Sequence, residues 1–139
     1  FGDHARIIVN VLHHFPPALV QAVIADAVRA GRGLFIAESF GRNPVALAGF
    51  AKAGLPALYT SPLRGEERLV RCGFMWASPI ALMAALWDGL VSTMRVYEEA
   101  DLRRLIAGVP GADTFEWRFG RYPVTRLGDG VWCMGLPRR

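Results

Sequence analysis

Residues 6–42 constrain the fold more than any other part of the chain, because they read as a strand, a helix and a second strand. Residues 6–12 form a short apolar run rich in β-branched side chains, which is typical of a strand buried on both faces. The prolines that follow stop this strand and can open a helix, and apolar residues recur at helical spacing over 18–30. Gly31 stands where a helix C-cap belongs, and residues 33–38 form a second apolar strand. A crossover of roughly thirty residues predicts a parallel, right-handed βαβ unit.

Polar side chains follow both predicted strands, at the edge of the sheet where ligands bind in open α/β folds. The end of the first strand carries an asparagine and two histidines, and the end of the second carries a carboxylate, a serine and an arginine. The residues concerned are Asn10, His13, His14, Glu38, Ser39 and Arg42. We therefore expect the functional site at the carboxyl ends of these two strands.

The adjacent histidines His13 and His14 could act as a general base, as metal ligands or as a pair that orients a substrate. In an extended chain neighbouring side chains point to opposite faces, so the two rings are poorly placed to chelate one ion and no metal site is predicted. We expect one histidine to face a pocket and the other to make a structural hydrogen bond.

Glu38 closes an otherwise apolar strand, where an unpaired carboxylate would be costly. The carboxylate therefore needs a partner, and either Arg42 or a hydroxyl group of a ligand is expected. A purely structural Glu38–Arg42 pair and a functional role of Glu38 both remain open.

The middle of the chain predicts helices. Residues 44–63 read as helices broken by turns, and the apolar stretch over 74–87 is too short to span a membrane, which takes about 20 apolar residues. A buried helix of a globular core, a helix lying on a membrane surface and a lid over an apolar substrate all fit this stretch. Asp88 and Arg95 follow two helical turns apart, which predicts either a buried ion pair or contacts with a substrate.

The last part of the chain predicts a helix and an antiparallel hairpin. Acidic residues load the first turn of a helix that begins near Glu98 and ends near Gly108, as the helix dipole favours. Residues 114–119 alternate between apolar and polar, residues 128–130 signal a turn, and residues 131–136 form a last strand that could pair back. The expected fold is therefore α/β, with a mixed sheet of about four strands, two of them parallel and two in a terminal antiparallel hairpin.

Length and composition limit the classes of protein. A chain of 139 residues fits a single domain over residues 1–139 with a core of its own. The net charge of +4 is carried by scattered arginines that form no stripe, which argues against a nucleic-acid partner. Cys72 and Cys133 lie far apart and show no metal or redox spacing, so a reducing cytoplasm is the expected location.

The motifs of the βαβ unit resemble the second half of a class I S-adenosylmethionine-dependent methyltransferase. Residues 9–15, Val-Asn-Val-Leu-His-His-Phe, are similar to the Leu-His-His-Phe-type motif that ends the fourth strand in that superfamily. The Gly31-Arg-Gly33 turn is similar to the turn before its fifth strand. Three later stretches, at 87–97, 115–117 and 135–137, resemble a bacterial subgroup that acts on small or unidentified molecules. The similarity covers nearly the whole chain from Ala5 onward.

The resemblance implies a partial Rossmann-like methyltransferase sheet that transfers a methyl group from S-adenosylmethionine to a small, apolar acceptor. It implies that the donor's methionine portion lies along Asn10, Val11 and Leu12. It places near the acceptor His13, His14, Glu38 and Arg42. The helical spacing of Asp88 and Arg95 makes them candidates for further substrate contacts. A histidine or Glu38 would take a proton from a hydroxyl or an acidic carbon. The helices of residues 44–94 would form a lid.

The first three strands of the superfamily are absent from the sequence, together with the glycine-rich loop and the acidic residue that holds ribose. Because the fourth strand of that sheet pairs with the first, residues 6–12 would form an uncapped apolar edge. We expect a homodimer or a missing N-terminal half to pair there. The alternative is a non-catalytic truncated domain that acts as a partner-binding or membrane-surface module. A hydrolase using His14 and Glu38 would lack a nucleophile in a recognisable setting.

Overall fold

The computed structural model describes residues 5–43, 67, 69–70, 72–73, 79–125 and 128–138, which form an α/β fold, as predicted. The strands are β1 (Arg6–Val9), β2 (Leu34–Glu38), β3 (Phe115–Thr125) and β4 (Gly128–Pro137). The helices are α1 (Pro17–Arg29), α4 (Pro79–Arg95) and α5 (Glu99–Ala107), with the short 3₁₀ helices η1 (Leu12–His14) and η3 (Ala112–Thr114). The predicted helices over 44–63, and most of the predicted lid before Pro79, lie outside the described residues.

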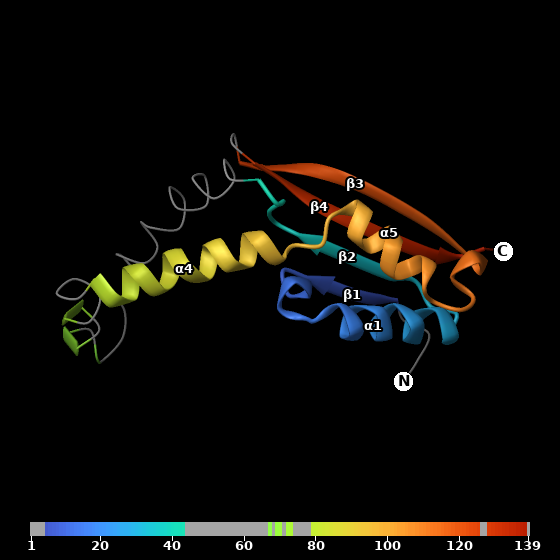
Figure 1. Cartoon of the computed structure of the whole chain (residues 1–139), viewed down its shortest axis with the longest axis horizontal. Helices are drawn as coiled ribbons and strands as arrows, with labels where there is room; N and C mark the ends of the chain where they lie inside the picture. Colours follow the sequence, from blue (N-terminus) through green and yellow to red (C-terminus); the bar gives the residue numbers. More distant parts are fainter. Residues whose placement is uncertain are drawn as a thin grey trace.

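The sheet has the strand order β1-β2-β4-β3. β1 pairs with β2 in parallel and β3 pairs with β4 as an antiparallel hairpin, which confirms both predicted pairings. β4 also pairs antiparallel with β2, so the last strand of the chain lies between β2 and β3 (Figure 1). The sequence pattern predicts the hairpin but not this insertion, which makes β3 run parallel to β1 and β2.

β1 ends at Val9, so the prediction that the strand reaches Leu12 is wrong. Asn10 turns the chain with a φ of 55°, a left-handed conformation that asparagine adopts more readily than most residues. Its side-chain oxygen accepts the backbone N–H of Ser39 at 2.6 Å. The apolar pattern continues through Val11 and Leu12, but by then the chain has left the sheet and entered η1.

The β3–β4 hairpin extends further than the alternating pattern predicts. Gly130 pairs with Tyr122 within the ladder, so the turn predicted over 128–130 is wrong and these residues belong to β4. A Cβ on Gly130 would lie 2.4 Å from the Tyr122 ring, and a Cβ on Gly120 would lie 2.6 Å from Trp132. Glycine at these two positions leaves room for an aromatic ring to cross the neighbouring strand, a role that alternation of apolar and polar residues does not reveal.

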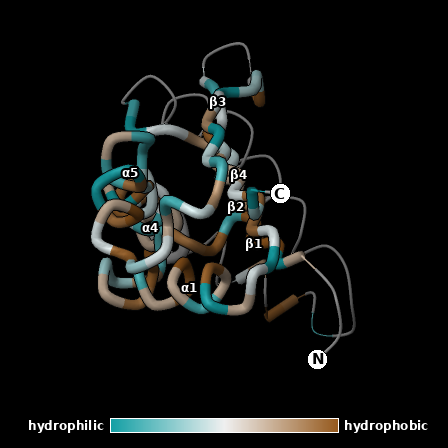
Figure 2. Tube along the Cα trace, turned by 90° about the vertical axis from the view of Figure 1, so that its right-hand side faces the viewer, coloured by the Kyte–Doolittle hydropathy of each residue, from teal (hydrophilic) through white to brown (hydrophobic). Residues whose placement is uncertain are grey.

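The helices α1 and α5 cover one face of the sheet (Figures 1 and 2). α1 ends in the predicted glycine cap, where Gly31 has a φ of 61° and the Arg32 N–H donates to the Ala27 carbonyl. The core between this face and the two helices contains Leu12, Val20, Ile24, Ala27, Leu34, Ile36, Leu102, Ile106 and Cys133.

The opposite face of the sheet is not covered by any described helix (Figure 2). Ile7 is 69% exposed and Val9 51% exposed, so the prediction of a strand buried on both faces is wrong for β1. Phe35 of β2 stacks on Trp132 of β4 on this face, with the ring centroids 6.4 Å apart. Within the described chain β1 has a strand neighbour on one side only, so it forms an edge of the sheet.

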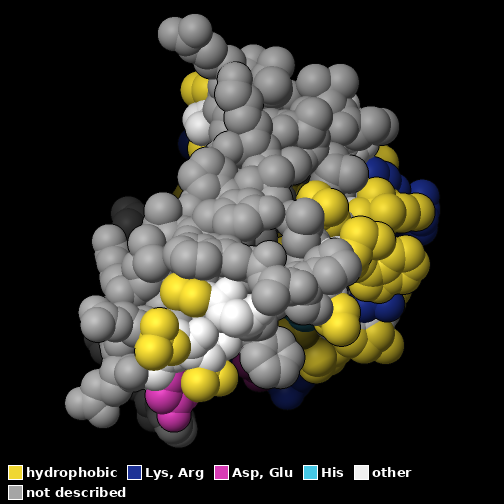
Figure 3. Space-filling view, turned by 90° about the vertical axis from the view of Figure 1, so that its left-hand side faces the viewer, with side chains coloured by type: hydrophobic (Ala, Val, Ile, Leu, Met, Phe, Trp, Pro, Cys, Tyr) yellow, Lys and Arg dark blue, Asp and Glu magenta, His cyan; other side chains and the backbone are white. Residues whose placement is uncertain are grey.

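α4 extends beyond the carboxyl ends of β1 and β2 (Figure 1). Its last turns pack against η1 and bury Ser92 and Thr93, whereas Ile80, Trp87 and Met94 are largely exposed. Figure 3 views the molecule from this end, and hydrophobic side chains gather on one side of it, with basic side chains beside them. None of the described helices is long and apolar enough to cross a membrane.

Burial of Cys133 predicts a dependence of stability on pH. The side chain is 1% exposed, and burial raises the pKa of its thiol from 9.0 to about 12. Between these pH values the thiol is protonated in the folded chain and ionised in the unfolded chain, so unfolding releases a proton. The contribution of the thiol to the free energy of unfolding is therefore complete below about pH 9 and is lost as the pH rises toward 12. We expect this thiol to lower the free energy of unfolding by up to about 1.4 kcal/mol per pH unit over that range.

Urea denaturation between about pH 8 and about pH 10.5 measures this slope in the wild type and in Cys133→Ala. Cys133→Ala is expected to be less stable at neutral pH but to lose less stability as the pH rises. Cys72→Ala is the matched control, because Cys72 is a free and less buried cysteine. Parallel pH profiles of wild type and Cys133→Ala would contradict the expectation.

Candidate functional site

Glu38 links the end of β2 to the short helix that follows β1. Its carboxyl group is 1% exposed, and its Oε1 accepts the backbone N–H groups of Leu12 at 2.7 Å and of His13 at 3.3 Å. Its Oε2 lies 2.8 Å from Nδ1 of the His13 ring. The carboxylate therefore caps η1 and fixes the His13 ring at the same time. The expected Glu38–Arg42 pair is wrong, since the partner of the buried carboxylate is His13.

His13 and His14 lie side by side, with their ring centroids 4.1 Å apart and their planes at 43°. The expectation that the rings point to opposite faces is wrong, because the two residues belong to a 3₁₀ helix and not to an extended chain. A 3₁₀ helix turns about 120° per residue, which leaves neighbouring side chains on adjoining sides. His13 is buried and makes the structural hydrogen bond that one histidine was expected to make, whereas His14 is exposed.

Both histidines line two cavities. The larger, of about 510 Å³, is here called the large histidine cavity; its apolar lining is Phe15, Pro16, Pro17 and Met94, and its polar lining is His13, His14, Arg42, Arg95 and Tyr97. The smaller, of about 130 Å³, is called the small histidine cavity and is lined by His13, His14, Phe40, Asp88, Gly89, Ser92 and Thr93. The site thus lies where η1, the end of β2 and the last turns of α4 meet.

Arg42 borders the large histidine cavity but is held by other groups. Its Nη2 donates to the Val96 carbonyl at 2.8 Å and lies 2.7 Å from Oδ2 of Asp101. Its backbone N–H donates to Oε1 of Glu98 at 3.1 Å. Arg42 therefore ties the segment after β2 to the start of α5, and its charge is neutralised by Asp101.

The buried ion pair predicted between Asp88 and Arg95 is wrong. Both side chains are exposed, and no ion pair joins them in the part of the chain that the structure describes. Asp88 borders the small histidine cavity and Arg95 the large one. Helical spacing places the two residues on one face of α4 but does not determine whether that face is buried.

The three residues expected beside the donor differ in accessibility. Asn10 is exposed, and its side-chain oxygen is used by Ser39. Val11 is 42% exposed, and Leu12 is fully buried in the core. Asn10 and Val11 can therefore offer side chains to a ligand at the carboxyl end of β1, whereas Leu12 supports η1 from inside.

Tyr97 is a site residue that the sequence pattern does not identify. Its hydroxyl donates to the Phe15 carbonyl at 2.7 Å, and both residues line the large histidine cavity. Burial, with a smaller contribution from Asp101, raises the pKa of Tyr97 above its ordinary value, and Arg95 opposes the shift. No local motif marks this residue, because its role depends on the packing of the segment after α4 against η1.

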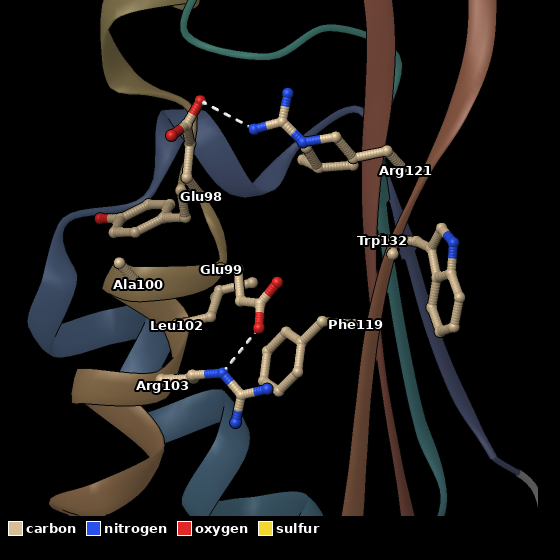
Figure 4. Close-up of a pocket in the computed structure, with 11 residues that line it drawn as sticks. Glu98, Glu99, Ala100, Leu102, Arg103, Phe119, Arg121 and Trp132 are labelled. Carbon is tan, nitrogen blue, oxygen red and sulfur yellow. Dashed lines mark hydrogen bonds and ion pairs between the residues drawn. The ribbon is translucent and has the colours of Figure 1, made fainter.

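A further cavity of about 350 Å³ lies between α5 and the β3–β4 hairpin; no described histidine lines it, although it shares Tyr97 with the large histidine cavity. Figure 4 shows its charged groups facing one another: Arg103 lies 2.8 Å from Glu99 and over the Phe119 ring, and Arg121 lies 3.9 Å from Glu98. Trp132 points away from these groups on the other side of the strands (Figure 4). Because these charged groups pair with one another, this cavity presents fewer unpaired charged groups to a ligand than the histidine cavities do.

No known protein family, curated protein or solved structure matches this chain. Among the described residues, no group of three or more histidine, cysteine, aspartate or glutamate side chains could hold a metal ion. The function is therefore argued from the geometry of the histidine site.

Proposed function

We propose that this chain is the acceptor-side half of a class I S-adenosylmethionine-dependent methyltransferase. The observation that carries the proposal is the buried Glu38–His13 pair beside a cavity of about 510 Å³. The pair lies at the carboxyl ends of two parallel strands, next to the region where open α/β sheets bind their ligands. The residues of this pair belong to the motifs that resemble the superfamily.

The sheet is compatible with the proposal. β1 and β2 are parallel and connected through α1, and a terminal antiparallel hairpin follows them, which is the arrangement expected for the acceptor-side half. The free edge of β1 would then be the place where the donor-binding strands of the superfamily pair.

In this proposal His13 acts as the general base. Its Nδ1–H donates to Glu38, which leaves Nε2 to accept a proton from an acceptor hydroxyl in the large histidine cavity. Glu38 stabilises the imidazolium that forms, as the carboxylate of a catalytic triad does. His14 and the cavity walls position the acceptor, and positioning supplies much of the rate.

Asn10 and Val11 fit the methionine end of the donor, because both are exposed at the end of β1. The sequence lacks the glycine-rich loop and the acidic residue that hold the adenosine part in the superfamily. When bound, S-adenosylmethionine supplies a methyl group on a sulfonium, and the electron pair of the broken C–S bond stays on sulfur as the acceptor–carbon bond forms. The proton of the acceptor passes to His13.

Calorimetric titration of the folded chain with S-adenosylhomocysteine tests the proposal. We expect micromolar binding, and a loss of roughly tenfold or more in affinity for Val11→Glu, since a carboxylate beside the donor would repel the carboxylate of its methionine portion. Val124→Glu on β3 is the matched control, because Val11 and Val124 are both 42% exposed. Absence of binding by a folded sample would exclude catalysis by this chain alone and would favour the partner-binding or membrane-surface module. Equal losses in both variants would contradict the assigned donor edge.

We also propose that β1 pairs with β1 of a second copy. A two-fold axis at Ile8 would place Ile7 of each copy opposite Val9 of the other, and both side chains are exposed. We expect light scattering to give a mass that rises with concentration toward a dimer. Ile7→Lys should shift the mass to that of a monomer, because a lysine on an edge strand opposes pairing, and Val124→Lys should not. A wild-type mass that stays monomeric would contradict the pairing.

A further inference from the structure

Among the described residues that line the large histidine cavity, one positive charge is not paired with any described carboxylate. Of the cavity's two arginines, Arg42 is neutralised by Asp101 at 2.7 Å. Arg95 is exposed at the end of α4 and has no ion-pair partner within the described part of the chain. No aspartate or glutamate is among the described residues that line this cavity. A ligand with one negative charge would therefore be favoured over a neutral or positive one.

Much of the remaining lining of the cavity is apolar. Phe15 and Pro16 come from the segment after η1, and Met94 comes from α4. The Tyr97 hydroxyl is already used by the Phe15 carbonyl, so Tyr97 offers mainly its ring. Proline and aromatic walls of this kind suit a flat apolar body, and the volume of about 510 Å³ lies within the usual range for small-molecule sites.

The small histidine cavity has the opposite charge. Asp88 borders it and is exposed, and no ion pair to Asp88 occurs in the described ranges. The paired rings of His13 and His14 are shared by the two cavities. An anionic group would thus be repelled from the side of Asp88 and attracted to the side of Arg95, which would orient a ligand relative to His13.

We infer that the large histidine cavity binds a small aromatic carboxylic acid, with the carboxylate on Arg95 and the ring against Phe15 and Met94. A guanidinium group matches a carboxylate in shape as well as in charge. The binding inference stands on the cavity, whereas a role of this acid as methyl acceptor rests on the proposed function. A hydroxyl on the ring would then be the group that His13 deprotonates.

Calorimetry with 4-hydroxybenzoate and with its neutral isostere 4-hydroxybenzamide tests the inference. We expect the wild type to bind the acid roughly tenfold more tightly than the amide, since a hydrogen bond to a charged group is stronger than one to a neutral group. Arg95→Gln should remove this preference. Arg104→Gln should keep it, because Arg104 is an exposed arginine of α5 that does not line the cavity.

Three results would overturn the inference: equal affinity for acid and amide, no binding of either, or an unchanged preference in Arg95→Gln. A parallel titration with S-adenosylhomocysteine separates this inference from the proposed function. Preference for the acid without binding of S-adenosylhomocysteine would support the cavity assignment and remove methyl transfer by this chain. Binding of S-adenosylhomocysteine without preference for the acid would support the proposed function and overturn the assignment of an aromatic acid to the cavity.

Discussion

Replacing Glu38 by alanine is expected to lower the free energy of unfolding by about 3–5 kcal/mol, the usual cost of breaking a buried ionic or hydrogen-bonded pair. The carboxylate is 1% exposed and accepts hydrogen bonds from two backbone N–H groups and from the His13 ring. Alanine would leave these three donors buried without an acceptor. Urea denaturation followed by circular dichroism measures the change.

Glu99→Ala is the control for this loss of stability. Glu99 also pairs with a basic side chain, Arg103 at 2.8 Å, but both partners are more than half exposed. The expected loss there is below about 1 kcal/mol, because solvent screens exposed pairs. A similar small loss for Glu38→Ala would show that the carboxylate does not hold η1 in place.

Replacing His13 by alanine is expected to reduce the rate of methyl transfer by about 10²- to 10⁴-fold, the usual contribution of a general base. Within the described residues, the His13 ring is the only side chain that hydrogen-bonds to the buried Glu38 carboxylate, at 2.8 Å. The measurement is the transfer of labelled methyl from S-adenosylmethionine to a hydroxyl acceptor, compared with His14→Ala. A His13→Ala rate within about threefold of the wild type would rule out His13 as the base.

Glu38→Gln sharpens this experiment. A glutamine can still accept the backbone N–H of Leu12, but its amide would face Nδ1 of His13 and favour the other tautomer of the ring. We expect a rate loss in Glu38→Gln with the fold retained, and little further loss when His13→Ala is added, because the two residues act as one unit. Multiplicative losses in the double variant would contradict a shared role.

The parts of the fold that the sequence predicts are those with local signals. The βαβ unit follows from periodicity, prolines and the Gly31 cap, and the terminal hairpin follows from alternation and glycines. The insertion of β4 between β2 and β3 could not be predicted in this way, because it depends on which strand edge is free. The exposure of Ile7 and Val9 could not be predicted either, since an apolar run does not reveal whether its sheet is covered on both faces.

The sequence places the candidate residues at the ends of two strands, where the structure has the two histidine cavities, but it predicts the wrong pairings among them. The 3₁₀ helix at Leu12–His14 reverses the expected placement of the two rings and brings Glu38 to His13. A helix of three residues makes a single turn, so no periodicity in the sequence can reveal it. Closeness in sequence suggests Arg42 as the partner of Glu38, whereas the actual partner of Arg42, Asp101, lies 59 residues away.

The most direct test of the account is to map donor binding on the isotope-labelled chain by amide nuclear magnetic resonance. On addition of S-adenosylhomocysteine, we expect the largest shifts at Asn10, Val11, His14 and Ser39, around the carboxyl ends of β1 and β2. The cavity between α5 and β3, represented by Arg103 and Phe119, should stay unchanged. Shifts centred on Arg103 and Phe119, or no shifts from a folded chain, would contradict the assignment of the histidine site to methyl transfer.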